Sequence, residues 1–350
     1  MNRVARIISL LLLPLLLGCS VGSTSKPSAA KPTQSNDTVT ETTHAVTGRL
    51  LYVQDNQIWL HHGTDAEPLP IKGEGASRDP SWSPDQRFIA YIHREESFAD
   101  LYLYDVASKR TIQITHNASA LQPRTQDYVH QLIWAAKPIW EPDGKALIYL
   151  SQTRPPTGEG EQPAIYEFPL SMFRYDLHLV GTREPINDDL LSVQQGGSDV
   201  LSPAWSPDGN YVAYVDAPRD DNPRQLMLYS FASGESQQYP GVPQGAYDPA
   251  WSPDGNSLAF AVNTDGATDI WVVPAPGGGT PQRITKLGRA RLPVWSPTGT
   301  ELAFLNVGDE GTDAYVVSVT QTNNRWEAGE PLPVTTGANI DATAGMNWGK

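Results

Sequence analysis

The chain has 350 residues, of which 39% are hydrophobic and 18% charged, and its 39 acidic and 25 basic side chains give a formal net charge of −14. Four basic and two acidic side chains fall in residues 1–48, so residues 49–350 hold 21 basic and 37 acidic ones and carry a formal charge of −16. An acidic body without a basic stripe repels nucleic acid and anionic lipid surfaces, so we expect no nucleic-acid partner.

Residues 1–18 are typical of an export signal, because two arginines precede an apolar run of about a dozen residues that is short for a membrane span. The last three residues of this signal and the one after it, Leu16 to Cys19, look like the lipobox of bacterial lipoproteins, in which the cysteine thiol is acylated. Cys19 is the single cysteine, and an unpaired thiol is otherwise unexpected in an exported protein. We predict palmitoylation of Cys19; an ordinary signal peptide or an uncleaved anchor is the alternative.

Residues 19–48 begin with the lipid-attachment cysteine and continue as SVGSTSKPSAAKPTQSNDTVTETTHAVTG. This segment is rich in Ser, Thr, Pro and Ala, and it cannot bury enough apolar surface to order itself. We predict a disordered tether that leaves the protein on the periplasmic or extracellular face of the cell envelope, in contact with the membrane through the lipid anchor only.

A phrase built around tryptophan recurs through residues 49–350. Five copies read PSWSPDQRFIAY, PIWEPDGKALIY, PAWSPDGNYVAY, PAWSPDGNSLAF and PVWSPTGTELAF, and the chain ends on a truncated copy, GMNWGK. The six tryptophans are Trp82, Trp140, Trp205, Trp251, Trp295 and Trp348. Repeats about 20–50 residues long are typical of solenoids and propellers, because one unit cannot bury its apolar face without a neighbour.

Each copy predicts two strands joined by a tight turn, in which Pro207, Asp208 and Gly209 fill the turn positions of the third copy. A further strand is indicated by aromatic pairs 11 residues apart: Tyr91 and Tyr102, Phe260 and Trp271, Phe304 and Tyr315. An Ile-Thr or Val-Thr pair then closes three of the units, at Thr115, Thr285 and Thr335. Radially repeated four-stranded sheets are the blades of a β-propeller.

The two ends of residues 49–350 complement each other. The last copy stops at its turn, just after Trp348, and residues 49–61 supply what look like the missing second and third strands, with Tyr52 and Trp59 at the aromatic positions. We therefore predict an all-β fold, a six-bladed β-propeller of four-stranded blades over residues 49–350, closed by combining the C-terminal and N-terminal strands.

The repeats resemble those of the TolB family, the periplasmic component of the Tol system, whose WD40-like PD40 repeats carry the phrase PxWSPDGxxIAF. The TolB family has an α/β domain before its propeller, where this chain has a short polar segment, so no partner-binding feature of that domain is carried over. Gln86, Glu141 and Thr298 depart from the phrase. Related propellers also precede the hydrolase domain of prolyl oligopeptidase-like enzymes.

The residues before each repeat proline are expected to rim the axial opening, because they lead into the innermost strand of a blade. The candidates are Arg78, Asp79, Lys137, Asp199, Tyr247, Asp248, Arg289, Arg291 and Asp341. Such a mixed-charge ring suits a small polar ligand or a peptide terminus. Alternatively, Asp79 and Asp248 cap the turns before Pro80 and Pro249.

No metal or cofactor site is indicated. Residues 263–269 and 306–313 cluster oxygen ligands around glycine without the spacing of a calcium loop, and the histidines show no zinc spacing. There is no GxSxG phrase. We predict a monomeric, non-enzymatic lipoprotein whose propeller binds or scaffolds envelope proteins or a small polar ligand; the alternative is a lyase or hydrolase acting on carbohydrate or lactone at the axial mouth.

Two longer units carry inserts at about residues 117–136 and 152–200. The aromatic residues Tyr166, Phe168, Phe173 and Tyr175 of the second insert alternate with other residues. Two interpretations are open: these aromatic residues complete an enlarged blade, or the inserts form a partner-binding crown.

Overall fold

The computed structural model describes residues 43–71, 73–118, 134–152, 170–176, 187–191, 198–218, 222–323 and 325–350. Among these residues the regular elements are β-strands, and no helix is long and apolar enough to cross a membrane. The predicted signal peptide, Cys19 and most of the predicted tether lie outside the described residues.

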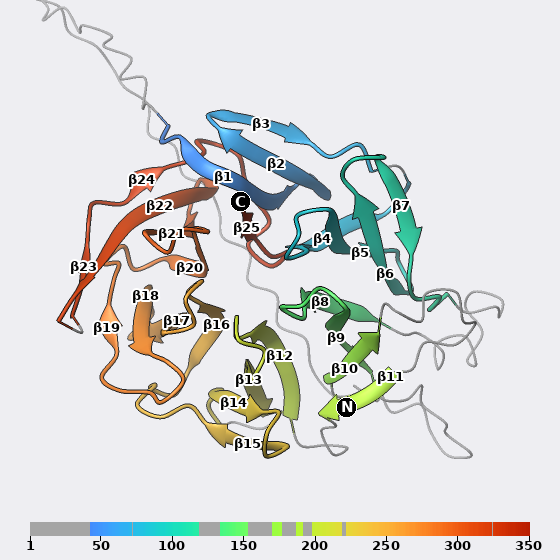
Figure 1. Ribbon diagram of the computed structural model, residues 1–350. Helices are drawn as coiled ribbons and strands as arrows, with labels where there is room; N and C mark the ends of the chain where they lie inside the picture. The colour runs from blue at the N-terminus through green and yellow to red at the C-terminus, as the bar shows by residue number, and fades with distance from the viewer. Residues whose placement is uncertain are drawn as a thin grey trace, which may run out of the picture. The chain divides into compact units, whose positions relative to one another are not determined.

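The described strands form six sheets arranged about a common axis (Figure 1). The first sheet contains β25 (Asn347–Gly349), β1 (Val46–Gln54), β2 (Gln57–Gly63) and β3 (Asp65–Pro68). The second contains β4 (Ala76–Trp82), β5 (Phe88–Arg94), β6 (Ala99–Asp105) and β7 (Arg110–Gln113). The third contains β8 (Ala135–Trp140), β9 (Ala146–Gln152), β10 (Leu170–Asp176) and β11 (Asn187–Leu191).

The remaining three sheets follow in chain order. The fourth contains β12 (Ser198–Trp205), β13 (Tyr211–Pro218), β14 (Gln225–Ser230) and β15 (Glu235–Gln238). The fifth contains β16 (Ala246–Trp251), β17 (Ser257–Thr264), β18 (Ala267–Pro274) and β19 (Gln282–Arg283). The sixth contains β20 (Ala290–Trp295), β21 (Glu301–Gly308), β22 (Gly311–Thr322), β23 (Arg325–Ala328) and β24 (Leu332–Pro333). The strands within each sheet pair antiparallel, and the architecture is an all-β propeller, as the repeats predict.

The hydrophobic core lies between the sheets. Six clusters of buried side chains each join two neighbouring sheets, and together they link every sheet to the next. On β17, Phe260 packs toward the fourth sheet while Ala259 and Ala261 pack toward the sixth, because alternate residues of a strand face opposite sides. Each sheet is thus covered on both faces, and this burial is what no single repeat achieves alone.

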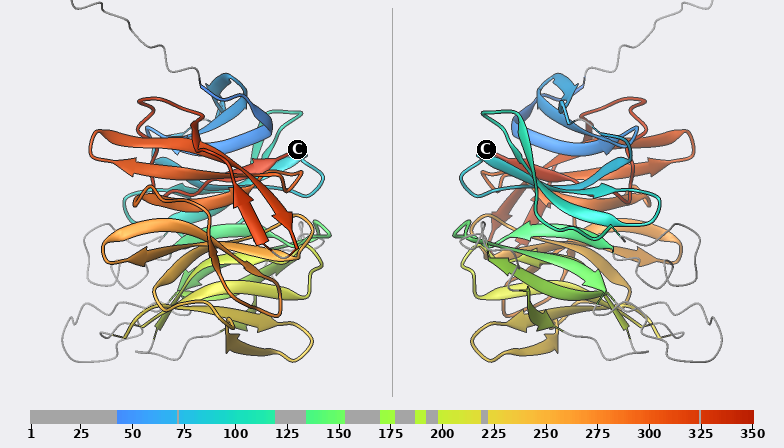
Figure 2. Two further views of the ribbon diagram at one scale, coloured as in Figure 1. Left: turned by 90° about the vertical axis from the view of Figure 1, so that its left-hand side faces the viewer. Right: turned by 90° about the vertical axis from the view of Figure 1, so that its right-hand side faces the viewer.

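The ends of the chain meet in one sheet, as predicted. β25 pairs antiparallel with β1, and Leu50 lies opposite Trp348. Tyr52 and Trp348 belong to the same hydrophobic cluster. The edge-on views of Figure 2 show the C-terminus lying among the strands of the first sheet. The contact between the first and sixth sheets therefore depends on residues from both ends of the described chain.

The first strand begins at Val46, earlier than the boundary at residue 49 expected from the repeats. Gly48 has a φ of +81°, and the register of β1 against β2 shifts between Val46 and Arg49. A bulge at Gly48 lets the strand begin at Val46, so residues 46–48 belong to β1 and not to the predicted tether. In addition, the His44 amide donates a hydrogen bond to the Pro333 carbonyl oxygen at 2.7 Å.

The spacing of 11 residues identified true cross-strand pairs. Tyr91 lies opposite Tyr102, Phe260 opposite Trp271, and Phe304 opposite Tyr315. Tyr52 lies opposite Trp59 in the same way.

The serine and aspartate of the repeated phrase hold its turn together. Ser206 Oγ donates to Asp208 Oδ1 at 2.5 Å and accepts a hydrogen bond from the Tyr211 amide at 2.9 Å. The Gly209 amide donates to the Ser206 carbonyl oxygen at 3.0 Å, with a φ of +78° that glycine adopts without strain. Burial raises the pKa of Asp208, but the hydrogen bonds from Ser206 and Asn210 outweigh it and the net pKa is lowered.

The tryptophan of the phrase connects neighbouring sheets. In three copies the indole Nε1 donates a hydrogen bond to a backbone carbonyl oxygen of the previous copy, at the residue just before the tryptophan of that copy. The bonds run from Trp140 to Ser81 (3.0 Å), from Trp251 to Ala204 (3.0 Å) and from Trp295 to Ala250 (3.1 Å). Trp205 differs, because its Nε1 donates to Gly209 of its own turn at 3.3 Å.

Two features depart from a plain four-stranded blade. In the sixth sheet β22 is 12 residues long, so its first half pairs with β24 and its second half with β23. In the third sheet Phe173 and Tyr175 lie on β10, which completes the sheet beside β9, in accord with the enlarged-blade interpretation for these two residues. Tyr166, Phe168 and most of the two inserts lie outside the described residues.

Candidate functional site

The innermost strands carry the same irregularity at the same place. In β4, β8, β12, β16 and β20 the residue before proline has a positive φ, and the register against the next strand shifts there. The residues and φ values are Asp79 (51°), Lys137 (48°), Ser202 (45°), Asp248 (52°) and Leu292 (51°). A bulge of this kind re-aims a side chain, and here it repeats around the axis.

Two cavities lie along this axis. The larger, about 460 Å³, is lined mainly by the prolines and tryptophans of the repeated phrase and by residues 345–350. The smaller, about 230 Å³, is lined in part by Lys137, Ser202, Asp248 and Leu292, which also line the larger one. Four of the five bulge residues therefore stand where the two cavities meet, whereas Asp79 lines only the larger one. We call the polar end with the smaller cavity the axial mouth.

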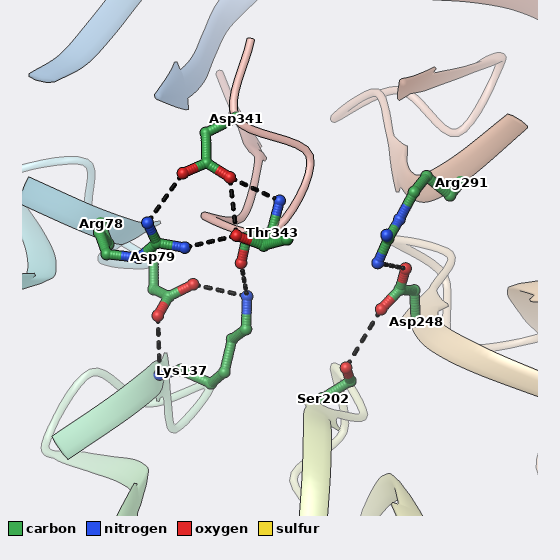
Figure 3. Close-up of polar contacts among 8 residues, drawn as sticks. All are labelled: Arg78, Asp79, Lys137, Ser202, Asp248, Arg291, Asp341 and Thr343. Atoms are coloured by element: carbon green, nitrogen blue, oxygen red, sulfur yellow. Dashed lines mark hydrogen bonds and ion pairs between the residues drawn. The ribbon is translucent and has the colours of Figure 1, made fainter. Parts of the chain in front are cut away.

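One polar group at the mouth joins the second sheet to the segment that leads into β25. Arg78 Nη1 lies 2.8 Å from Asp341 Oδ2, and its Nη2 donates to Thr343 Oγ1 at 2.6 Å (Figure 3). Lys137 Nζ lies 2.5 Å from Asp79 Oδ1 and donates to the Thr343 carbonyl oxygen at 3.1 Å. Three separate parts of the chain are therefore held together by charge-assisted hydrogen bonds.

Asp341 is held as a carboxylate in this group. Burial raises its pKa, but hydrogen bonds from the Thr343 hydroxyl and amide, together with the Arg78 guanidinium, have the larger combined effect, so the pKa of Asp341 lies below its ordinary value. The carboxylate of Asp341 is therefore part of the local structure at neutral pH.

A second polar group lies across the mouth from the first (Figure 3). Asp248 accepts a hydrogen bond from Ser202 Oγ at 3.2 Å and lies 3.4 Å from Arg291 Nη2. The Arg291 guanidinium carbon stands 5.6 Å from the centre of the Tyr247 ring, within range of a cation–π contact. Among the described residues, the buried Nε of Arg291 has no hydrogen-bond partner.

The structure brings the six principal sequence candidates to this one end. Arg78, Asp79 and Lys137 belong to the first polar group, and Tyr247, Asp248 and Arg291 belong to the second. The carboxylates of Asp79 and Asp248 bridge to neighbouring sheets, through Lys137 and Arg291, so the interpretation that they only cap local turns is incomplete.

Other sequence candidates have different places. Asp341 joins the first polar group, whereas Asp199 and Arg289 are not among the described residues that line the two cavities. Sequence reasoning missed Ser202, Arg224 and Thr343 at the mouth. The position of Ser202 before a repeat proline is a usable signal, but Thr343 reaches Arg78 only because the ring closes.

The glycine-rich segment that begins at Asn263 forms a turn. Asp265 and Gly266 are the two central residues of the hairpin turn that connects β17 to β18. Their φ values of 52° and 84° are the positive values that this type of two-residue turn requires. Among the described residues, no group of three or more His, Cys, Asp or Glu side chains is placed to hold a metal ion.

Comparisons with known proteins agree with the propeller architecture. Residues 186–330 match the family model of the TolB beta propeller domain, and residues 26–155 match that of the dipeptidyl peptidase IV (DPP IV) N-terminal region. An uncharacterized peptidase of Bacillus subtilis (strain 168), YuxL, is 27% identical over 185 residues, which are 52% of this chain and 21% of that protein.

Two solved structures extend this comparison. TolB from Acinetobacter baumannii superposes with a TM-score of 0.59 at 17% identity, covering 86% of this chain and 66% of that one. A putative TolB from Agrobacterium tumefaciens gives a TM-score of 0.55 at 15% identity, covering 82% of this chain and 88% of that one. At such identities the similarity establishes a TolB-like propeller fold, and a shared fold does not imply a shared function.

Proposed function

We propose that this protein is an exported binding protein, attached to a membrane by a lipid on Cys19, whose propeller holds an envelope protein or a small polar ligand at the axial mouth. The observation that carries the proposal is the convergence of polar side chains from five innermost strands and the segment before β25 on one end of the axis. Clefts of this kind, with a few polar groups over an apolar lining, are typical of binding sites.

Two further observations support a binding role. The resemblance to the TolB family favours a partner in the cell envelope, and the acidic composition favours a soluble body that stays clear of anionic lipid. Among the described residues that line the two cavities there is no histidine, the commonest general base. We propose a binding or scaffolding module rather than an enzyme, and we propose separately that it is a monomer.

Capture from detergent-solubilised envelope tests this role. The tethered protein and an Arg78→Gln/Lys137→Gln double variant would be used as parallel baits, followed by mass spectrometry. A partner retained by the wild type and lost from the double variant supports the axial mouth as the binding surface. Partners retained equally by both baits would contradict it, provided that both baits show cooperative melting.

Lipid attachment is tested separately by metabolic labelling with radioactive palmitate. We expect label in the wild type and none in a Cys19→Ser variant. Equal labelling of the two proteins, or no labelling of the wild type, would overturn the anchor without affecting the binding role.

The binding site is proposed to sit on a six-bladed ring, each of the six described sheets being one blade. The six interlocking hydrophobic clusters support this count, because each bridges one pair of neighbours. Deleting residues 340–350 removes β25 and should abolish cooperative thermal unfolding. A truncated protein that melts like the wild type would count against a ring closed at this point.

The enzymatic alternative is a lyase or hydrolase acting on carbohydrate or lactone at the same mouth. Turnover of such a substrate that is abolished by substitution of Arg291 or Lys137 would favour this alternative. Absence of turnover across a panel of these substrates would leave the binding role in place.

A further inference from the structure

We infer that the smaller axial cavity binds a carboxylate, either of a small organic acid or of a peptide C-terminus, with the apolar body of that ligand against a wall of leucine and valine side chains. The inference rests on the proposed binding function and specifies the chemistry of the ligand. Its basis is a local reversal of charge, an incompletely used guanidinium and the makeup of the cavity wall.

The charge around the smaller cavity is opposite to that of the propeller. Its described lining contains three cations, Lys137, Arg224 and Arg291, and one carboxylate, Asp248. Asp79 pairs with Lys137 and Asp341 pairs with Arg78 at the edge of the mouth. Counted over the described residues, these two carboxylates and Asp248 stand against four cations when Arg78 is included, which gives a formal charge of +1. In a propeller with a formal charge of −16, this is a local region where an anion is attracted rather than repelled.

Arg291 has hydrogen-bonding capacity that the protein leaves unused. Its separation from Asp248 is 3.4 Å, longer than the roughly 2.7–2.9 Å of a strong charge-assisted bond. Its Nε is buried without an acceptor among the described residues, which is a costly state for a guanidinium N–H. A carboxylate in the cavity would offer two acceptor oxygens to this planar donor, which is suited to bidentate recognition once the guanidinium turns toward it.

Arg224 is a second arginine at the same cavity. Among the described residues no side chain forms a hydrogen bond or ion pair with its guanidinium, and its residue is exposed. Its chain neighbours Asp220 and Asp221 lie outside the described residues. Lys137, by contrast, is already engaged by Asp79, so we assign the main contacts with the ligand to Arg291 and Arg224.

Much of the rest of the cavity wall is apolar. Leu150, Leu201 and Val215 come from the third and fourth sheets, and the remaining lining residues are Ala136, Leu292 and Ala342 together with the more polar Ser202, Tyr247 and Thr343. A purely inorganic anion would leave this wall without a contact, whereas an acid with a short aliphatic body would cover it. The volume of about 230 Å³ is below the usual range for drug-sized ligands, so the cavity suits one small molecule or the last residue of a peptide.

The experiment compares an acid with its neutral amide on the whole propeller. Isothermal titration at low ionic strength would use N-acetyl-leucine and N-acetyl-leucinamide, which differ only in the carboxylate. We expect the acid to bind about tenfold more tightly, the ratio given by one charge-assisted hydrogen bond. Arg291→Gln or Arg224→Gln should remove that preference and leave the weak affinity for the amide unchanged.

Arg87→Gln is the matched control, because Arg87 is an exposed arginine paired with Asp105 away from the cavity, and it should leave the preference for the acid intact. Equal affinity for acid and amide, no binding of the acid, or a preference that survives both substitutions would overturn the inference. The melting temperature of each variant is measured in parallel, and Arg224→Gln serves as the decisive variant if Arg291→Gln proves unstable.

A pentapeptide ending in leucine, with a free or an amidated C-terminus, distinguishes the two sources of the carboxylate. Tighter binding of the free peptide than of N-acetyl-leucine indicates a peptide C-terminus, and weaker binding indicates a small acid; either supports a carboxylate site. If these probes fail while the wild-type bait still captures a partner that the Arg78→Gln/Lys137→Gln bait loses, the carboxylate inference is wrong and the binding function stands.

Discussion

Arg78 and Asp341 are 263 positions apart in the chain, yet Nη1 and Oδ2 of the two side chains lie 2.8 Å apart. Asp341 also accepts hydrogen bonds from the amide and hydroxyl of Thr343, at 2.8 and 2.7 Å. This contact joins the second sheet to the segment that completes the first, so the polar mouth and the closure of the ring share residues.

The lowered pKa of Asp341 predicts a pH dependence of stability. Because the folded-state pKa lies below the unfolded value of about 3.9, the ionised carboxylate stabilises the fold above that pH, and this contribution is lost as the pH falls through the folded-state pKa. The melting temperature of Asp341→Asn should therefore lie below that of the wild type at pH 7, and the difference should shrink below about pH 4. Thermal melts from acid to neutral pH measure this difference.

Asp309→Asn removes a carboxylate from an exposed turn and controls for the change in net charge. A difference between the wild type and Asp341→Asn that stays constant across this pH range would show that Asp341 does not stabilise the fold through its charge.

The indole hydrogen bonds between sheets predict unequal effects of Trp→Phe substitutions. Trp295→Phe removes the indole N–H that donates to the Ala250 carbonyl oxygen in the neighbouring sheet. Because that oxygen then lacks this hydrogen bond, the free energy of unfolding should fall by about 1–3 kcal/mol. Trp205→Phe should cost less, because its Nε1 makes only a 3.3 Å bond within its own turn. Urea denaturation of the two variants checks the order, and a larger loss for Trp205→Phe would contradict it.

A buried carboxylate–threonine pair predicts a strong effect of a nearly isosteric change. Thr285 Oγ1 donates to Asp269 Oδ1 at 2.8 Å and accepts from the Ile270 amide at 3.0 Å, and Asp269 is 2% exposed. Thr285→Val removes the hydroxyl, so the Asp269 carboxylate loses one donor and the Ile270 amide loses its bond to that hydroxyl. The free energy of unfolding should therefore fall by about 1–3 kcal/mol.

Thr264→Val is the matched control, because Thr264 lies exposed at the end of β17. It should change the free energy of unfolding by less than about 0.5 kcal/mol. Similar effects of the two substitutions in denaturant melts would show that the Thr285 hydroxyl does not support the fold.

The site of ring closure predicts a steric effect at glycine. A Cβ atom at Gly349 would lie 2.7 Å from Trp82 Cδ1, inside the second sheet's contact with β25. Gly349→Ala should therefore lower the melting temperature by several degrees, since overpacking costs about 1–3 kcal/mol. Gly277→Ala is the control, because a Cβ there meets nothing within 4 Å. Equal melting temperatures for the two variants would show that this contact relaxes without cost.

Local features of this fold were predictable from the sequence. The pairing of Phe260 with Trp271 follows from a short hairpin, in which strand length and turn determine the register. The left-handed turn residue Gly209 follows from its place after proline and aspartate. The joining of β25 to β1 was also predictable, because the truncated last repeat and the opening strands supply complementary parts of one sheet.

The sequence alone determined the repeat, its strands and which residues precede the repeat prolines, since each of these depends on neighbours within a few tens of positions. The tertiary structure decided what those residues do at the mouth. Asp248 meets Ser202 and Arg291, and Arg78 meets Thr343, only because the sheets pack around an axis and each innermost strand bulges before its proline. Distances between side chains on different sheets depend on the packing of the whole ring, and no local spacing in the chain encodes them.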